Sequence, residues 1–328
     1  MPTDAHAAAG QLGSAATQSA NTGNGATDSR GVIHNIGYRR YDDVRLGRPA
    51  IVRALMWHSL RSAFGIGRGA KAKIFPALLF GLICLPAAVN AVALATNPGG
   101  SPIVGYDSYI PSLRTVVMLI FVAAQAPELV SRDLRSHVLP LYYSRPLRRL
   151  DYPLAKYAAF SAACLLLVEI PLIILYLGTI VSVGGGSAVW DQTKALIPGL
   201  GVAALWAVLL AAIGLLLASF TGRRAYATGM IAIYFFLTWI LARILINIAW
   251  PGQGPGPLTS GAPLGARLPG LISPFTVLDG VRQWLGGTNP GPIPNPGGAG
   301  VVYGLMFVLL LAVSLGGLAV RYRRVGAS

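Results

Sequence analysis

The stretch YAAFSAACLLLVEIPLIILYLGTIVSV, residues 157 to 183, is almost entirely apolar and contains one charged side chain, Glu169. A helix needs about 20 consecutive apolar residues to cross the hydrocarbon core of a bilayer, so this stretch predicts a transmembrane helix. Lipid offers the backbone no hydrogen-bond partners, which is why such a segment must be helical. Five further segments share this character, and the six predicted spans are residues 74–96, 108–126, 157–183, 195–220, 225–250 and 300–320. The predicted fold class is therefore all-α integral membrane, with six transmembrane helices.

The composition of the whole chain agrees with this prediction. Of the 328 residues, 54% are hydrophobic and 11% are charged, and the mean hydropathy is +0.60. Soluble domains carry about 25% charged residues, so the composition excludes an ordinary soluble globular protein. The two cysteines, Cys84 and Cys164, fall inside predicted spans and lack metal-type spacing. We expect them to be packing residues that form neither a disulfide nor a metal site.

The net charge of +15 is distributed unevenly along the chain. Ten Lys or Arg residues precede the first span, six lie between the second and third spans, two follow the fourth, and three follow the sixth. All of these fall on one side of the membrane if the six spans alternate in direction. The positive-inside rule then predicts that both termini are cytoplasmic. Because this distribution accounts for the basic charge, membrane lipids are expected partners and nucleic acid is not.

Three regions are predicted. Residues 1–47 form a polar cytoplasmic tail whose composition, rich in Gly, Ala, Ser, Thr and Asn, is typical of disorder. Residues 48–73 form an amphipathic helix on the inner membrane surface, and residues 74–328 form the six-helix transmembrane domain. The apolar face of the amphipathic helix carries Val52, Met56, Leu60 and Phe64, with Trp57 beside them. A solvated helix that packs on a partner is the alternative for that region.

A polar loop, PELVSRDLRSHVLPLYYSRPLRRLDYPLAK at residues 127 to 156, separates the second and third spans. Its first part carries an apolar stripe at helical spacing, with charged residues around it; the stripe consists of Val130, Leu134, Val138 and Leu141. Two interpretations are open. The loop is either a cytoplasmic helix that docks on another protein, where the stripe supplies burial and the charges set the register, or an ordinary cytoplasmic loop with snorkelling arginines.

A long outer loop, residues 251–299, is rich in Gly and Pro and contains SPFTVLDGVRQWLGG. Ser273 is an N-cap candidate, Pro274 suits the first helical position, and Gly286 is a stop signal. These signals predict a short amphipathic helix that dips into the outer leaflet or lines the outer mouth. Its outer-gate residues would be Phe275, Leu278 and Trp284. A surface lid without a transport role is the alternative.

Glu169 lies near the middle of the third span, followed two residues later by Pro171. A carboxyl group at this depth is costly in lipid, so it should face the bundle interior, a cavity or a partner. Pro171 removes a backbone hydrogen bond, which makes this region a candidate hinge or part of a substrate path. A structural Glu that is hydrogen-bonded to neighbouring helices is the alternative. Arg243, in the outer part of the fifth span, is a candidate ion-pair partner that snorkelling would have to bring close.

The residues needed for catalysis are not grouped in any recognisable motif. The sequence has four histidines, and it contains no His-Glu-x-x-His, no Gly-x-Ser-x-Gly and no paired-Asp motif. The stretch GIGRGAK lacks the spacing of a phosphate-binding loop, and no metal-ligand cluster is apparent. A polytopic membrane enzyme acting on lipids or peptides, or a non-transporting membrane anchor, remains an alternative to a transporter.

Residues 128–156 resemble the loop between the second and third helices in membrane subunits of type-2 ABC exporters. The shared pattern is an acid, an Arg-Asp pair, a short apolar run, SRP, a basic pair, and then Tyr and Lys at the next span. The stretches IGYRRYDDVRLGRPA, FGIGRGAKAKIFP and SPFTVLDGVRQW look like segments of a branch typical of actinobacteria. The excess of 22 Arg over 4 Lys also suits a GC-rich genome.

The resemblance implies a permease subunit in a bacterial cell membrane, with six helices and both termini cytoplasmic. Two such subunits, identical or similar, would pair, and each would bind a cytosolic ATPase that carries the ATP and Mg, so this chain itself would bind no cofactor. The helix of the polar loop would be the coupling helix seated on that ATPase. Its docking residues would be Glu128, Arg132, Asp133, Arg135, Arg145 and Arg148. The complex would export an amphipathic or lipid-like molecule.

Overall fold

The computed structural model describes residues 46–97, 106, 111–144, 146–183, 185–251, 264–285 and 296–325. The chain divides into two compact units, residues 1–45 and 46–328, and every described residue belongs to the second. Within the described residues all regular structure is helical, as predicted. The predicted polar tail lies outside the described residues except for its last two positions.

Among the described residues, six helices are long and apolar enough to cross a membrane, which confirms the predicted number of spans. They are α2 (Ala70–Thr96), α3 (Pro111–Leu129), α6 (Asp151–Ser182), α7 (Gly186–Ala218), α8 (Arg224–Ala249) and α11 (Gly300–Val325). At about 1.5 Å per residue, α6 is about 48 Å long and so exceeds the hydrocarbon core of about 30 Å. An upright α6 would therefore extend beyond the lipid tails.

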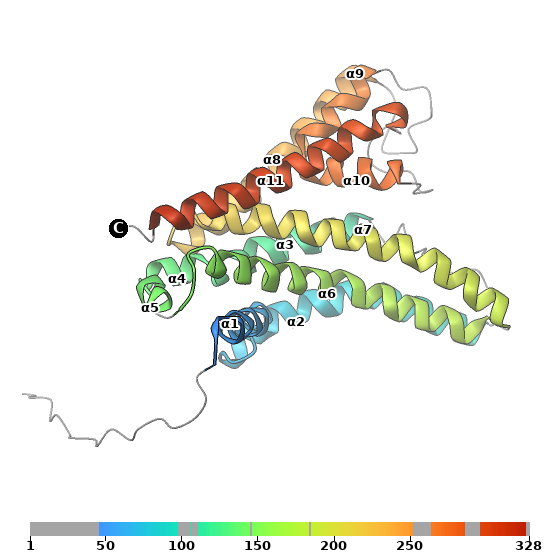
Figure 1. Cartoon of the computed structure of the whole chain (residues 1–328). Coiled ribbons are helices and arrows are strands. Elements are labelled where there is room, and N and C mark those ends of the chain that lie inside the picture. Colours follow the sequence, from blue (N-terminus) through green and yellow to red (C-terminus); the bar gives the residue numbers. More distant parts are fainter. Residues whose placement is uncertain are drawn as a thin grey trace, which may run out of the picture. The chain divides into compact units, whose positions relative to one another are not determined.

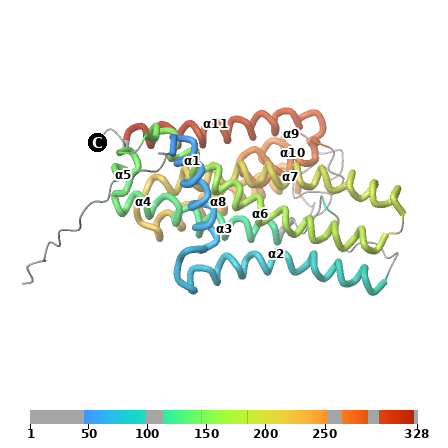
Figure 2. The backbone as a smooth tube through the Cα atoms, turned by 60° about the horizontal axis from the view of Figure 1, so that its bottom comes forward, coloured from blue at the N-terminus to red at the C-terminus, as the bar shows by residue number. Residues whose placement is uncertain are grey.

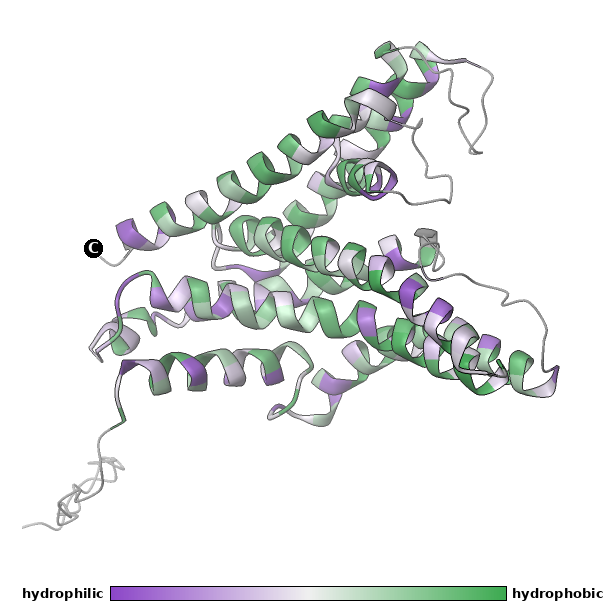
Figure 3. Ribbon diagram, turned by 45° about the vertical axis from the view of Figure 1, so that its right-hand side comes forward, coloured by the Kyte–Doolittle hydropathy of each residue, from purple (hydrophilic) through white to green (hydrophobic). Residues whose placement is uncertain are grey.

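The shorter elements gather at the two ends of the six-helix bundle (Figures 1 and 2). One end carries α1 (Arg48–Ala63), α4 (Ser131–Arg135), α5 (Leu139–Tyr143) and the C-terminal end of α11. We call this the basic end. The other end carries α9 (Leu264–Arg267), the 3-10 turns Leu268–Ile272 (η1) and Gly297–Ala299 (η2), and α10 (Pro274–Trp284). Hydrophobic residues run along the long helices between these ends (Figure 3).

Close packing of small residues holds the long helices together. Helix α6 contacts α2, α7 and α1, while α3 contacts α7 and α8. Lipid tails are as apolar as the side chains, so helix association in a membrane depends on close contact rather than on the hydrophobic effect. At the crossing of α6 and α2, a Cβ atom added to Gly178 would lie 2.7 Å from Ala91 Cα. Only glycine permits this approach.

Helix α10 agrees with its predicted boundaries and lies deep in the protein. It begins at Pro274 after an extended Ser273 and ends at Trp284, although the Ser273 side chain makes no capping hydrogen bond. All residues from Pro274 to Arg282 are buried, and α10 packs on α7, α8 and α11. A surface lid is therefore the wrong interpretation of this helix. The predicted stop, Gly286, lies outside the described residues.

Candidate docking site at the basic end

The polar loop does not form the single amphipathic helix that its stripe predicts. Glu128 and Leu129 complete α3, and two five-residue helices, α4 and α5, follow. The break between them falls at His137, whose φ of 49° lies in the left-handed region that non-glycine residues rarely adopt. The segment predicted to form a coupling helix thus consists of two short helices, with His137 between them.

The apolar stripe of this loop faces the protein's own bundle. Val130 is buried, and Leu134 packs against the hydrophobic core. Only Leu141 projects outward, with 68% of its surface exposed. In addition, Ser131 Oγ donates a 2.8 Å hydrogen bond to the carbonyl of Ala218, at the end of α7. Most of the stripe therefore fixes α4 to the membrane helices and is unavailable to a partner.

Glu128 joins three segments that are far apart in the sequence. Arg68, in the turn between α1 and α2, donates from Nη1 to Glu128 Oε2 at 2.6 Å, and Arg224, the first residue of α8, pairs with Oε1. Arg68 also donates from Nη2 to the carbonyl and the hydroxyl of Ser62. The carboxylate thus links the end of α3 to α8 and to the start of α2.

Asp133 occupies a second, more enclosed ion pair. Its Oδ2 lies 2.9 Å from Lys156 Nζ and accepts a 2.7 Å hydrogen bond from the hydroxyl of Tyr152. The Lys156 side chain is only 6% exposed. Tyr152 is fully buried between the rings of Tyr142 and Tyr322, so α4, α5, α6 and the end of α11 meet at this point.

Asp151, the first residue of α6, forms the third pair. Arg48 donates to both carboxylate oxygens, at 2.7 and 2.5 Å, in the bidentate geometry that suits a guanidinium. The backbone N–H of Arg148 also donates to Asp151 Oδ2 at 2.8 Å. The hydrogen bond with Asp151 raises the pKa of Arg48 further above its ordinary value. The pair fixes the start of α1 to the start of α6.

These contacts change the predicted docking surface. Glu128 and Asp133, predicted to contact a partner, are engaged inside the chain, whereas Arg132, Arg135 and Arg148 are exposed and form no ion pair with a described residue. Arg145 lies outside the described residues. Every acidic residue in the described part of this end is paired internally. Its outer surface is consequently basic.

The predicted ion pair between Glu169 and Arg243 is not formed. Glu169 is half-buried on α6 and makes no ion pair with Arg243 or with any other described residue. Arg243 lies on α8, a helix that packs mainly on α3, α7 and the α9–α10 region. Helix α6 continues through Pro171 without interruption. The roles of Glu169 and Pro171 in a substrate path or hinge therefore stay predictions.

The predicted gate residues separate into two groups at the other end. Phe275 and Leu278 are buried, and the Phe275 ring lies 5.6 Å from that of Trp206 and 5.1 Å from that of Phe235. Trp284, by contrast, is 46% exposed. Of the three, only Phe275 and Leu278 thus lie in the protein interior, where the side chains of a gate would have to move.

A buried charge cluster that the sequence did not reveal lies beside Phe275. Arg282 Nε is 3.8 Å from Asp279 Oδ1, and the Arg114 guanidinium stacks 4.5 Å from the centre of the Trp206 ring. Burial raises the pKa of Asp279, an effect that the positive charges of Arg114 and Arg282 partly offset. The cluster connects α3, α7 and α10.

The fold defines a helical, multi-pass membrane protein. No known protein family matches the chain, and no curated protein matches it either. Within the described residues, no three His, Cys, Asp or Glu side chains come together as a metal site would require. The candidate site therefore has to be argued from its own geometry.

Proposed function

We propose that the chain is the transmembrane subunit of an ATP-driven exporter of the ABC type, which moves an amphipathic or lipid-like substrate outward across a bacterial cell membrane. A separate cytosolic ATPase, carrying ATP and Mg, docks on the α4–α5 segment. The basic end and both termini face the cytoplasm, and a second permease subunit, identical or similar, completes the transporter.

One observation carries the proposal. The α4–α5 segment lies at one end of the bundle and is connected to two long helices, through the ion pair of Asp133 with Lys156 to α6 and through the hydrogen bond of Ser131 with the carbonyl of Ala218 to the end of α7. A segment held in this way moves together with the helices to which it is bonded. A partner that pushes on α4 and α5 would therefore shift α6 and α7, which is what coupling of ATP hydrolysis to transport requires.

The docking surface in this proposal consists of exposed groups only. Arg132 and Arg135 on α4 and Arg148 before α6 offer charge, and Leu141 offers an apolar contact. Exposed charges at the rim of an interface mainly set association rate and register, and an apolar centre supplies burial. The internally paired Glu128 and Asp133 act as connections between this surface and the spans.

The test is co-purification of the chain with the ATPase encoded beside it, followed by transport in proteoliposomes. Charge reversal of Arg132→Glu together with Arg135→Glu should abolish both partner retention and ATP-dependent transport. Lys71→Glu is the matched control, because Lys71 is exposed at the same end but lies on α2. Retention and transport at the wild-type level in the double variant would remove the docking assignment. A chain that turns over a lipid or peptide without any ATPase would be an enzyme instead.

A further inference from the structure

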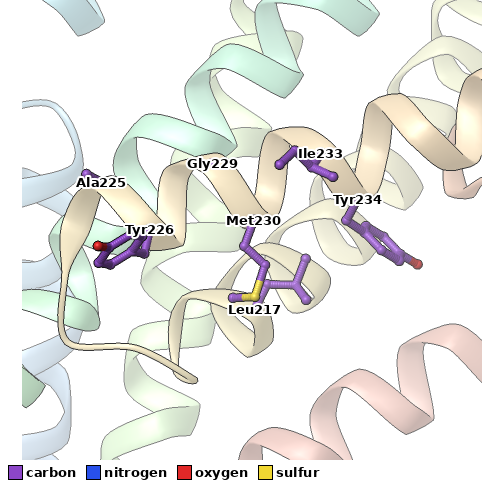
Figure 4. A pocket seen from close by; sticks show the side chains of 7 residues that line it. All are labelled: Leu217, Ala225, Tyr226, Gly229, Met230, Ile233 and Tyr234. Carbon is purple, nitrogen blue, oxygen red and sulfur yellow. The ribbon is translucent and has the colours of Figure 1, made fainter.

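An apolar groove runs along the first turns of α8 where they pass the end of α7 (Figure 4). It is a shallow, open groove with a volume of about 510 Å³. Its walls are almost wholly apolar and consist of Leu217, Ala225, Tyr226, Gly229, Met230, Ile233 and Tyr234. Met230 and Leu217 meet near the middle of the groove, with Tyr226 and Tyr234 on either side of them.

Two cations, Arg223 and Arg321, lie at the segment that joins α7 to α8, and neither has an acidic partner among the described residues. The Arg223 guanidinium lies over the ring of Tyr226 at 5.7 Å. The Arg321 guanidinium, from α11, lies 5.9 Å from the ring of Phe220, and its Nε donates a 3.3 Å hydrogen bond to the carbonyl of Ser219. By contrast, the nearby Arg224 is paired with Glu128. Arg223 and Arg321 thus keep N–H donors available for an anion.

The position of the groove selects a membrane ligand. The lining residues of α8 occupy about its first ten positions, or about 15 Å of helix, which is about half the thickness of the hydrocarbon core. The groove therefore lies at the depth of one leaflet, the one nearest the basic end. Arg223 and Arg321 lie at the connection between α7 and α8, before the lining residues of α8 begin, which corresponds to the depth of lipid headgroups.

A second copy of this chain is a poor occupant. In a two-fold symmetric interface the same surface patch meets itself, which would bring Arg223 and Arg321 of one subunit towards the same residues of the other. Like charges in such an arrangement repel each other. An apolar chain that ends in an anionic group complements both parts of the site, because guanidinium groups bind phosphate and carboxylate oxygens strongly.

We propose that this groove binds a membrane amphiphile with an anionic headgroup, taken from the leaflet at the basic end. The hydrocarbon chain lies along Leu217, Met230 and Tyr234, and the headgroup contacts Arg223 and Arg321. This binding requires no ATPase, so it stands independently of the proposed function.

The test uses the full chain in nanodiscs of phosphatidylcholine that contain a small fraction of photoactivatable lipid. A phosphatidylglycerol probe should label residues 217–234, and a phosphatidylcholine probe with the same photoactivatable chain should label them weakly. Arg321→Gln removes a charged hydrogen-bond donor and should lower labelling by phosphatidylglycerol about tenfold. Gly229→Phe should abolish it by filling the groove, since nothing lies within 4 Å of a Cβ built at Gly229.

Gly81→Phe is the matched control, because Gly81 is exposed on α2 and also has open space around its Cβ. It should leave labelling unchanged, and size-exclusion profiles should show that all variants fold. Equal labelling by the two probes, insensitive to both variants, would mean ordinary surrounding lipid and would overturn the proposal. Two other results would also overturn it: displacement of the probe by glycerol phosphate alone as well as by phosphatidylglycerol, or crosslinking of the groove to a second chain.

Discussion

Lys156 on α6 points its Nζ at Asp133 on α4, 2.9 Å away, in a position almost closed to water. A charge buried in this way depends on its partner, and removing one member of a buried pair commonly costs about 3–5 kcal/mol because the other charge is left uncompensated. The stability of α4 therefore depends on α6 and that of α6 on α4, although the two helices are separate segments in the sequence.

The first prediction concerns this pair. Lys156→Met should lower the thermal unfolding temperature markedly, because Asp133 then keeps only the hydroxyl of Tyr152 as a partner among the described residues. The double variant Asp133→Leu with Lys156→Met should recover much of the loss. Thermal unfolding in mild detergent measures both effects. Lys71→Met, at an exposed position, is the control, and a Lys156→Met chain as stable as the control would refute the argument.

The second prediction concerns Glu128 and the start of α8. Glu128→Gln removes the charge that holds Arg68 and Arg224, so α8 should loosen at its first turn. Limited trypsin digestion should then cut faster after Arg223 and Arg224 than in the wild type. Glu169→Gln removes a carboxyl that forms no ion pair with a described residue, and it should digest at the wild-type rate. Identical digestion of the two variants would show that Glu128 does not stabilise the first turn of α8.

The third prediction concerns the crossing of α2 and α6. Gly178→Leu places a side chain where Ala91 already lies, so the helices must separate, and overpacking of this kind typically costs about 1–3 kcal/mol. The yield of monodisperse protein and its unfolding temperature should both fall. Gly81→Leu introduces the same side chain on the exposed surface of α2 and should be tolerated. Equal stability of the two variants would contradict the close packing of these helices.

The fourth prediction is a dependence of stability on pH. Burial raises the pKa of Asp279 above the ordinary value of 3.8, so the folded state holds this proton more tightly than the unfolded state. Stability contributed in this way is complete below pH 3.8 and declines as the pH rises through the folded pKa. The unfolding temperature of Asp279→Asn relative to wild type should therefore increase with pH over that window. A difference that stays constant with pH would argue against the raised pKa.

The spans could be predicted from the sequence because each depends on a local property, a run of apolar residues long enough for the bilayer. The start of α10 could also be predicted from a local signal, because Pro274 occupies the first helical position. The ion pairs could not be predicted from a local sequence signal. Glu128 meets Arg68, 60 residues earlier, and Arg224, almost 100 residues later, and the sequence around each residue carries no sign of the other.

The polar loop shows why an amphipathic pattern does not identify its partner. The stripe from Val130 to Leu141 has helical spacing, which predicts that one side of the segment is buried. The spacing does not predict whether the chain itself or a partner covers that side. In the structure the chain's own bundle covers Val130 and Leu134, and only Leu141 is left outside. The resemblance to exporter subunits implies that Glu128 and Asp133 contact a partner, whereas the structure pairs both acids inside the chain.

The burial of α10 has a consequence for how the protein is made. This helix carries Asp279 and Arg282 and lies between the last two spans. In the proposed orientation, with the basic end in the cytoplasm, it would have to be translocated before it could pack. Its site is completed by α11, where Tyr303 lies against Gly280 and Gly270. The end of the bundle that lies opposite the basic end can therefore close only after the final span has been inserted, and a chain released before that point would leave α10 exposed to quality-control proteases.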